Sequence, residues 1–169
     1  RRIMEKGKTD NITPYGTEAM AIMRIEKGHV AGGELDGRTT PDDLGLNKLI
    51  SYKKEFIGRR LLKREGFIDP KRPKLVGLIP IDGKSRIRTG SILVKDPNAS
   101  LPMPKLGHVS SGAYLSPTLK HPISLGLITG GTDRIGETVW ATSPLYGETN
   151  EVKIVDPVFY DKQGERLNG

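Results

Sequence analysis

The chain contains no cysteine. Without a thiol it can form no disulfide, no thiolate zinc site and no cysteine nucleophile. This absence fits a reducing compartment, and we expect a cytoplasmic protein. The sequence also lacks an apolar run approaching the roughly 18 residues of a membrane-spanning helix, so no membrane partner is expected. The first residues, RRIMEKGK, have no apolar core of the kind found in signal peptides.

Aromatic residues are scarce, at 5% of 169 residues, and hydrophobic residues make up 35%. This composition supports a modest core, enough for one domain or for one and part of another. The 21 glycines and 12 prolines indicate many turns, which favour short strands over long helices. Because the first residue is arginine and not methionine, we expect a piece of a longer polypeptide.

Acidic residues are too few to balance the basic ones, and the net charge is +7. Most of the excess lies in residues 53–74, which carry nine Lys or Arg and three acidic residues. Such a segment can be a solvated linker surface, or it can bind an acidic partner, a polyglutamate tail or nucleic acid. Few aromatic residues are interleaved with these charges, so base stacking has little support and nucleic acid is disfavoured as a partner.

Complete catalytic and metal-binding motifs are also missing. The three histidines are scattered and lack the spacing of a metal site: His29, His108 and His121. Ser110, Ser111 and Ser116 do not lie in a Gly-x-Ser-x-Gly turn, and the glycines at 130 and 131 lack the Lys-Ser/Thr ending of a P-loop. We therefore expect no complete catalytic set and no metal ligand within this chain.

The N-terminal half is predicted to contain helices separated by loops. The clearest helix runs from Thr17, as its cap, to about residue 27, with Gly28 as its breaker and Ala19, Ile22 and Met23 on its apolar face. Further helices are predicted over residues 1–6, 40–46 and 54–64, with a possible strand over 46–50 and a glycine-rich loop over 28–41.

Two residues near the end of that helix are candidates for a functional role. Glu26 falls on or beside the apolar face, so its carboxylate must be paired or held for a ligand, because burying it bare is costly. Arg24 points to another part of the helix and is not expected to be its partner. A third candidate, Tyr114, lies in a turn between Gly112 and Pro117, where its ring could pack as a lid or stack on a planar ligand.

The sequence DPKRP at residues 69–73 is the strongest domain boundary, because two prolines and three charges separate dissimilar halves. It divides the chain into residues 1–68 and 69–169. Six short strands are predicted in the second part, over residues 75–81, 92–94, 106–110, 123–128, 138–142 and 151–155. Strands at this spacing without intervening helices indicate a small antiparallel barrel or sandwich.

Several of these segments resemble one known family. The N-terminal part contains TPYGTEAMAIMRIEKGHVAGGELDGRTTPDDLGL (13–46) and EFIGRRLL (55–62), and the C-terminal part contains SSGAYLSPTLKHPISLGLI (110–128), IGETV (135–139) and VKIVDPVF (152–159). In order and spacing they are similar to the folate-dependent aminomethyltransferase family of the glycine cleavage T-protein. The resemblance implies an α+β chain: a partial α/β folate-binding subdomain, then a small antiparallel six-stranded β-barrel.

Within this family the sequence is most similar to the C-terminal region of the α subunits of heterotetrameric sarcosine oxidases. The pointers are PYGTEAM, RIEKGHV, DGRTTPDDLGL and LIPIDGKSRIRTG. Arg24 and Glu26 match the Arg-Leu-Glu of the family, whereas Met20 stands where T-proteins have a folate-contacting arginine. The alternatives are a T-protein-type aminomethyltransferase, a basic nucleic-acid-binding barrel and a structural docking domain.

The resemblance also implies a division of labour. A flavin-bearing part oxidises sarcosine, and the folate module transfers the oxidised methyl carbon to tetrahydrofolate, giving 5,10-methylenetetrahydrofolate. The catalytic aspartate is expected upstream of this chain, and flavin and NAD elsewhere in the complex. Tyr114, Glu26 and Arg24 are the expected folate contacts. The expected partners are the upstream part of the same subunit and the other subunits; alone, the chain could dimerise and would be inactive.

Overall fold

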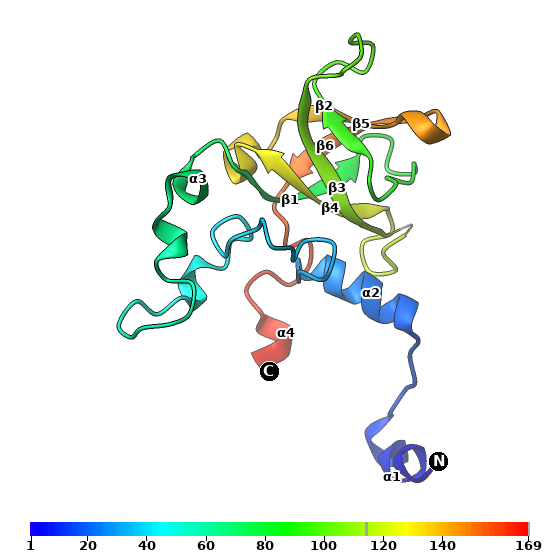
Figure 1. Cartoon of the computed structure of the whole chain (residues 1–169). Coiled ribbons are helices and arrows are strands. Elements are labelled where there is room, and N and C mark those ends of the chain that lie inside the picture. The colour runs from blue at the N-terminus through cyan, green and yellow to red at the C-terminus, as the bar shows by residue number, and fades with distance from the viewer. Residues whose placement is uncertain (114, 169) are drawn as a thin grey trace.

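A computed structural model of the chain describes residues 1–113 and 115–168, so the role predicted for Tyr114 lies outside the described residues. Its C-terminal half is a closed barrel of six strands in the order β1-β4-β3-β2-β5-β6, with every neighbouring pair antiparallel (Figure 1). The strands are β1 (Pro73–Pro80), β2 (Ile92–Val94), β3 (Lys105–Ala113), β4 (Ile123–Thr129), β5 (Thr138–Ser143) and β6 (Glu148–Val155). The predicted α+β class and six-stranded barrel are confirmed.

The barrel interior is filled by aliphatic side chains from all six strands. Together with Ile87, from the segment between β1 and β2, they form one buried cluster: Val76, Leu78, Leu93, Val109, Ile128, Val139, Ala141, Val152 and Ile154. Each large aliphatic side chain contributes about 1.5–3 kcal/mol when it is fully buried. β6 alternates exposed and buried residues, because one of its faces meets this interior and the other meets solvent.

The outer face of β3 and β4 is covered by α2 (Thr17–Glu26), which lies beside the barrel in Figure 1. A second apolar cluster fills this contact and includes Ile25, Leu125 and Leu127, with Ile22 packed at its edge. Since β4 packs on the interior through one face and on α2 through the other, nearly all of its residues are buried.

Two details of α2 differ from the prediction. Gly16, and not Thr17, occupies the capping position, and no side chain caps the helix. The face that contacts the barrel contains Ile22 and Ile25, whereas Met23 is 44% exposed. Ile22 and Ile25 are three residues apart and therefore lie on the same side of the helix, where both pack against the barrel. Met23 points to another side of the helix.

Residues 40–68 contain much less regular structure than predicted. The helix expected over 40–46 is reduced to turns: Thr40 and Asp43 exchange hydrogen bonds as in a helix start, but Gly45 adopts a left-handed φ of 71° that ends the helix at once. The strand expected over 46–50 is instead the 3-10 helix η2 (Asn47–Leu49). Among the residues that the structure describes, no strand pairs with residues 46–50.

The helix predicted over 54–64 is also absent. That stretch forms turns and the 3-10 helix η3 (Leu61–Lys63), and the short helix α3 (Glu65–Ile68) follows, so Gly66 lies within a helix and does not end one. Neither η3 nor α3 contains a buried residue. A short helix has little stability unless it packs against other elements, and this explains why the helical pattern of residues 54–64 does not form a helix here.

The N-terminal elements α1 (Arg2–Lys6) and η1 (Gly7–Asp10) extend away from the barrel and bury no residue (Figure 1). The predicted helix over residues 1–6 is thereby confirmed. The remaining elements are η4 (Gly131–Arg134), η5 (Pro144–Tyr146) and the C-terminal α4 (Glu165–Asn168). Of the helices in the described part of the chain, none is both long and apolar enough to span a membrane.

Candidate functional site

Arg24 is the centre of a polar network between α2 and the barrel. Its Nη2 donates a hydrogen bond to Ser111 Oγ at 2.7 Å, and Ser111 Oγ in turn donates to Glu34 Oε1 at 2.6 Å. Its Nη1 lies 3.4 Å from Glu34 Oε2 and 3.1 Å from the carbonyl oxygen of His29. The Ala31 amide donates to Glu34 Oε2 at 2.8 Å. The network therefore joins α2, the 28–41 loop and strand β3.

Glu34 is fully buried, yet it is held in the charged form. Burial alone would raise the pKa of its carboxyl, but the hydroxyls of Ser110 and Ser111, the Ala31 amide and the charge of Arg24 outweigh it, and the pKa is lowered. An ionised carboxylate is the right acceptor for these donors. Because Ser111 accepts from Arg24 and donates to Glu34, its single hydroxyl proton has one defined direction.

Glu26 forms a second buried connection, on the adjoining side of the hairpin between β3 and β4. Its carboxylate accepts hydrogen bonds from the hydroxyls of Ser116 and Thr118, the latter at 3.2 Å. Its backbone carbonyl accepts from the amides of Phe159 and Tyr160 at 2.9 and 3.0 Å. A single residue thus fixes α2, the hairpin and the segment after β6 relative to one another.

Glu26 and Arg24, two of the expected site residues, therefore lie in one region but do not pair with each other. Glu26 is paired with hydroxyls and Arg24 with Glu34, in agreement with the expectation that the two are not partners. The carboxylate of Glu26 is buried, while the side chain of Arg24 retains 25% exposure. Their chemical capacity in this chain is to position the hairpin against α2. Their folate contacts, like that of Tyr114, stay predictions.

Glu34 is the residue that sequence reasoning missed. It lies in a glycine-rich stretch whose composition predicts a loop, and nothing in the neighbouring residues indicates that its side chain is buried. The available signal was indirect: Arg24 lies two positions from Glu26 on a helix and needed a different acidic partner. Gly33 permits the close approach, since a Cβ there would lie 2.7 Å from the carbonyl oxygen of Ser110.

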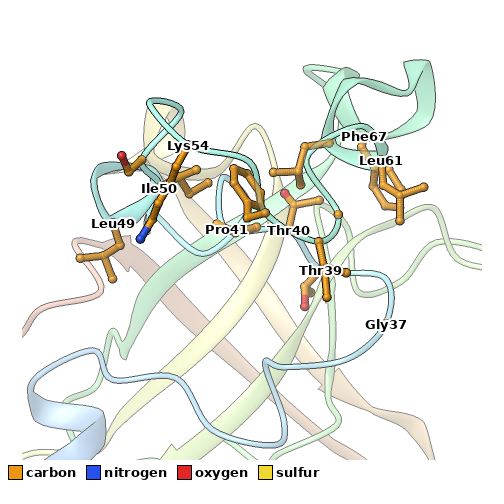
Figure 2. A pocket seen from close by; sticks show the side chains of 14 residues that line it. Gly37, Thr39, Thr40, Pro41, Leu49, Ile50, Lys54, Leu61 and Phe67 are labelled. Carbon is orange, nitrogen blue, oxygen red and sulfur yellow. The ribbon is translucent and has the colours of Figure 1, made fainter.

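A mainly apolar cavity lies elsewhere, between the 37–41 loop and the segment 49–67 (Figure 2). This cavity of about 640 Å³ is lined mainly by apolar side chains, with a few polar groups: Gly37, Thr39, Thr40, Pro41, Leu49, Ile50, Ser51, Lys54, Phe56, Ile57, Gly58, Leu61, Leu62 and Phe67. Neither Arg24 nor Glu26 contributes to it. Its size is in the range of small-molecule sites, and its open apolar wall could equally receive protein side chains.

The basic segment 53–74 is only partly neutralised. Arg59 pairs with Glu55 at 2.6 Å, Arg72 with Asp43, and Lys74 with Asp42 at 3.0 Å. The other basic side chains of the segment form no ion pair with a residue that the structure describes: Lys53, Lys54, Arg60, Lys63, Arg64 and Lys71. This part of the surface therefore keeps a positive charge.

No metal site emerges from the described residues, where no three His, Asp or Glu side chains are grouped to hold an ion. His121 Nδ1 lies 2.9 Å from the carbonyl oxygen of Pro122. His29 contributes its backbone carbonyl to Arg24, and His108 lies on β3.

The barrel provides the decisive comparison with known proteins. A family model described as the glycine cleavage T-protein C-terminal barrel domain matches residues 74–161, just over half of the chain. The chain belongs to the glycine cleavage T-protein family. A second family model, the GCVT N-terminal domain, matches residues 1–54. Both parts of the expected resemblance are thereby confirmed, while the exact domain division at residues 68 and 69 stays a prediction.

Individual relatives come from two branches. The chain is 44% identical to "Sarcosine oxidase subunit alpha" of Rhizobium meliloti over 98% of its own length and 17% of that protein. It is 32% identical to "Aminomethyltransferase" of Desulfitobacterium hafniense over 96% of its length and 42% of that protein. The chain thus spans about a sixth of the sarcosine oxidase subunit and less than half of the aminomethyltransferase.

A solved structure agrees with the fold. The crystal structure of glycine cleavage system aminomethyltransferase T from Bartonella henselae superposes with a TM-score of 0.73 at 22% identity, over 96% of this chain and 44% of that one. The shared fold includes the helical N-terminal part as well as the barrel, because nearly the whole chain is covered.

Proposed function

We propose that this chain is the folate-binding C-terminal portion of a sarcosine oxidase α subunit. The observation that carries the proposal is the 44% identity to the Rhizobium meliloti subunit over 98% of the chain, against 32% for the aminomethyltransferase of Desulfitobacterium hafniense. In the proposed reaction, sarcosine, O₂ and tetrahydrofolate give glycine, 5,10-methylenetetrahydrofolate and H₂O₂. The two electrons removed from sarcosine reduce O₂, and the oxidised methyl carbon is transferred to the folate.

The role proposed for the present residues is to build one wall of the folate site. The described residues do not form a complete folate site, since Glu26 and Glu34 already have internal hydrogen-bond donors. Arg24, with part of its side chain exposed, and Tyr114 are the proposed direct contacts, and Glu26 positions the hairpin that carries Tyr114. The catalytic carboxylate, flavin and NAD are proposed to lie outside this chain.

The partners proposed for this chain are the upstream part of the same subunit and the other subunits of the oxidase. Large apolar side chains are exposed on the N-terminal elements, among them Ile3, Tyr15, Met20 and Met23. Exposed apolar side chains on these elements are the kind that a protein–protein contact covers, and in isolation they would favour dimerisation. Met20, at the position of the folate-contacting arginine in T-proteins, is 53% exposed.

The test follows the methyl carbon of sarcosine in the purified enzyme that contains this chain. With ¹³C-methyl sarcosine and tetrahydrofolate, the label is expected in 5,10-methylenetetrahydrofolate; without folate, it is expected in formaldehyde, with H₂O₂ formed in both cases. Label that stays in formaldehyde despite folate would contradict the folate-binding role. Inertness toward sarcosine, with ammonia release from an aminomethyl-lipoyl carrier, would identify a T-protein-type aminomethyltransferase instead.

Tyr114→Ala tests the proposed contact between Tyr114 and the folate. The substitution is expected to raise the Kd for tetrahydrofolate by about tenfold, corresponding to loss of one stacking contact, while the rate of sarcosine oxidation is unchanged. Tyr146→Ala is the control, because Tyr146 is an exposed tyrosine of η5, outside the hairpin between β3 and β4. Equal affinities of the two variants would remove Tyr114 from the site.

A further inference from the structure

A second cavity, of about 610 Å³, lies between the loop 36–43 and the first residues of strands β1 and β3. Its apolar lining includes Pro73, Ile92, Leu106 and Leu127. Its charged and titratable lining residues are Asp36, Arg38, Asp43, Arg72, Lys105 and His108. We call it the basic cleft, since its positive groups outnumber its carboxylates.

Most of these charges neutralise one another within the cleft. Arg38 donates to Asp36 Oδ2 through Nε at 2.9 Å and through Nη2 at 2.6 Å. Arg72 is paired with Asp43 through three hydrogen bonds. The ammonium group of Lys105, an exposed residue, forms no ion pair or hydrogen bond with a residue that the structure describes. It is therefore the uncompensated positive charge of the basic cleft.

A bulge in β3 places His108 on the same side of the sheet as Lys105. Opposite β2, Ile92 pairs with His108 and Leu93 with Gly107, but Val94 pairs with Lys105, so β3 contains one extra residue. In a regular strand, residues three apart face opposite sides. The extra residue cancels this alternation, since Ile92 and Val94 share a face and their partners share it with them. Ile92 itself lines the cleft.

His108 is half-buried, and neither of its ring nitrogens has a hydrogen-bond partner among residues 1–113 and 115–168. Burial first, and then the positive charges of Lys105 and Arg38, lower the pKa of its imidazole; Asp36 and Glu34 oppose this effect without reversing it. A neutral imidazole still carries one N–H donor. A positively charged side chain and an unsatisfied donor thus face the same cavity from one strand.

We propose that the basic cleft binds a small organic anion through a carboxylate or phosphate group, which Lys105 and His108 hold while Arg38 lies at the rim. The apolar lining from Ile92, Leu106 and Leu127 receives the carbon skeleton of the ligand, and the volume exceeds what an inorganic ion needs. Neither Arg24 nor Glu26 lines this cleft, so the site is independent of the proposed folate role.

Binding should strengthen as the pH falls. A bound anion opposes the charges of Lys105 and Arg38 and so favours the imidazolium form of His108, which raises the pKa of His108 in the complex. By linkage, the affinity for the anion rises as the pH drops through the range in which His108 takes up its proton. Protonation of Asp36 or Asp43 contributes nothing above about pH 5, since both are ion-paired carboxylates.

The experiment is isothermal titration calorimetry of the purified protein with glutarate and, separately, with inorganic phosphate, at about pH 6 and about pH 8 and at constant ionic strength. At least one probe is expected to bind saturably, and glutarate, whose carboxylates stay mostly ionised at both pH values, is expected to bind more tightly at the lower one. The two arms distinguish a carboxylate from a phosphate ligand. Lys105→Gln is expected to weaken binding about tenfold, and Lys105→Arg to retain most of it.

Lys153→Gln is the matched control, since Lys153 is an exposed lysine on β6 that does not line the cleft. His108→Gln is expected to remove the pH dependence while keeping a donor at that position. Near-UV circular dichroism of every variant reports whether the fold is kept, and Lys105→Met, which also removes the charge, replaces Lys105→Gln if that variant unfolds. Absence of saturable binding by both probes, or equal weakening by Lys105→Gln and Lys153→Gln, would overturn the proposal.

Discussion

The guanidinium of Arg24 donates to the hydroxyl of Ser111, 87 residues farther along the chain, across 2.7 Å. Ser111 then donates to Glu34, so a helix, a loop and a barrel strand share one chain of charge-assisted hydrogen bonds. Arg24, Ser111 and Glu34 each have a partner inside the protein, so the connection stabilises the contact between α2 and the barrel. It fixes the face of the barrel on which α2 rests.

Removal of the Ser111 hydroxyl is expected to weaken the whole junction. Ser111→Ala leaves the buried Glu34 without one donor and Arg24 without one acceptor, and should lower the free energy of unfolding by about 2–3 kcal/mol. Urea denaturation measures the change. Ser100→Ala, at an exposed serine, should stay within about 0.5 kcal/mol of the parent. Similar losses in both variants would contradict a structural role for the network.

The second junction makes a separate prediction. Ser116 is fully buried and donates to Glu26, whereas Thr118 donates to the same carboxylate from an exposed position. Ser116→Ala should cost about 2 kcal/mol, because the desolvated carboxylate loses its buried donor, while Thr118→Ala should cost about 0.5 kcal/mol. Thermal unfolding of the two variants gives the ratio. A larger effect at Thr118 would show that Glu26 depends on its exposed partner.

Acid is expected to destabilise the protein partly through Glu34 and Asp43. In Asp43, burial would raise the pKa, but hydrogen bonds from Arg72 and Thr40 and the charge of Arg72 lower it; Glu34 is lowered likewise. A lowered folded-state pKa gives stability that is present above the unfolded pKa, about 4, and is lost as the pH falls through the folded pKa. The free energy of unfolding should therefore decline below about pH 5.

The double variant Glu34→Gln and Asp43→Asn tests that assignment. It should be less stable than the parent at neutral pH and show a flatter decline in acid, because the two titrating groups are gone. Urea unfolding at a series of pH values measures both curves. Parallel curves for parent and variant would mean that other carboxylates, such as Asp82 with its pKa of about 2, dominate the acid response.

Substitutions at two glycines distinguish the cost of backbone strain from the cost of a steric clash. Gly28 and Gly45 have left-handed φ angles of 66° and 71°, but a Cβ at Gly28 would lie 2.5 Å from the carbonyl oxygen of Pro157, while one at Gly45 would meet nothing within 4 Å. Gly45→Ala should cost about 1 kcal/mol of stability from strain, and Gly28→Ala about 3 kcal/mol. Chemical denaturation gives both values. Equal costs would exclude a tight fit between the end of α2 and the segment after β6.

The sequence by itself was sufficient to predict the barrel strands. All six were expected near their observed positions, because their apolar residues have partners within the chain and their turns are marked by glycine and proline. It was also sufficient to predict α2 within one residue of its observed end, since Gly28 provides the left-handed turn that stops a helix. The sequence motifs were likewise sufficient to predict membership of the T-protein family.

Only the tertiary structure decided what these elements face. Glu34 appeared as a loop residue, and its burial depends on Ser111, which lies 77 residues away. Lys105 and His108 should face opposite sides of a regular strand, and a bulge set by pairing with β2 places them together. Residues 40–64 carry helical signals that fail, because a short helix needs a packing partner that the sequence of the segment does not specify. The preference for helix or turn depends on neighbouring residues, whereas side-chain burial, strand pairing and strand register depend on residues far away in the sequence.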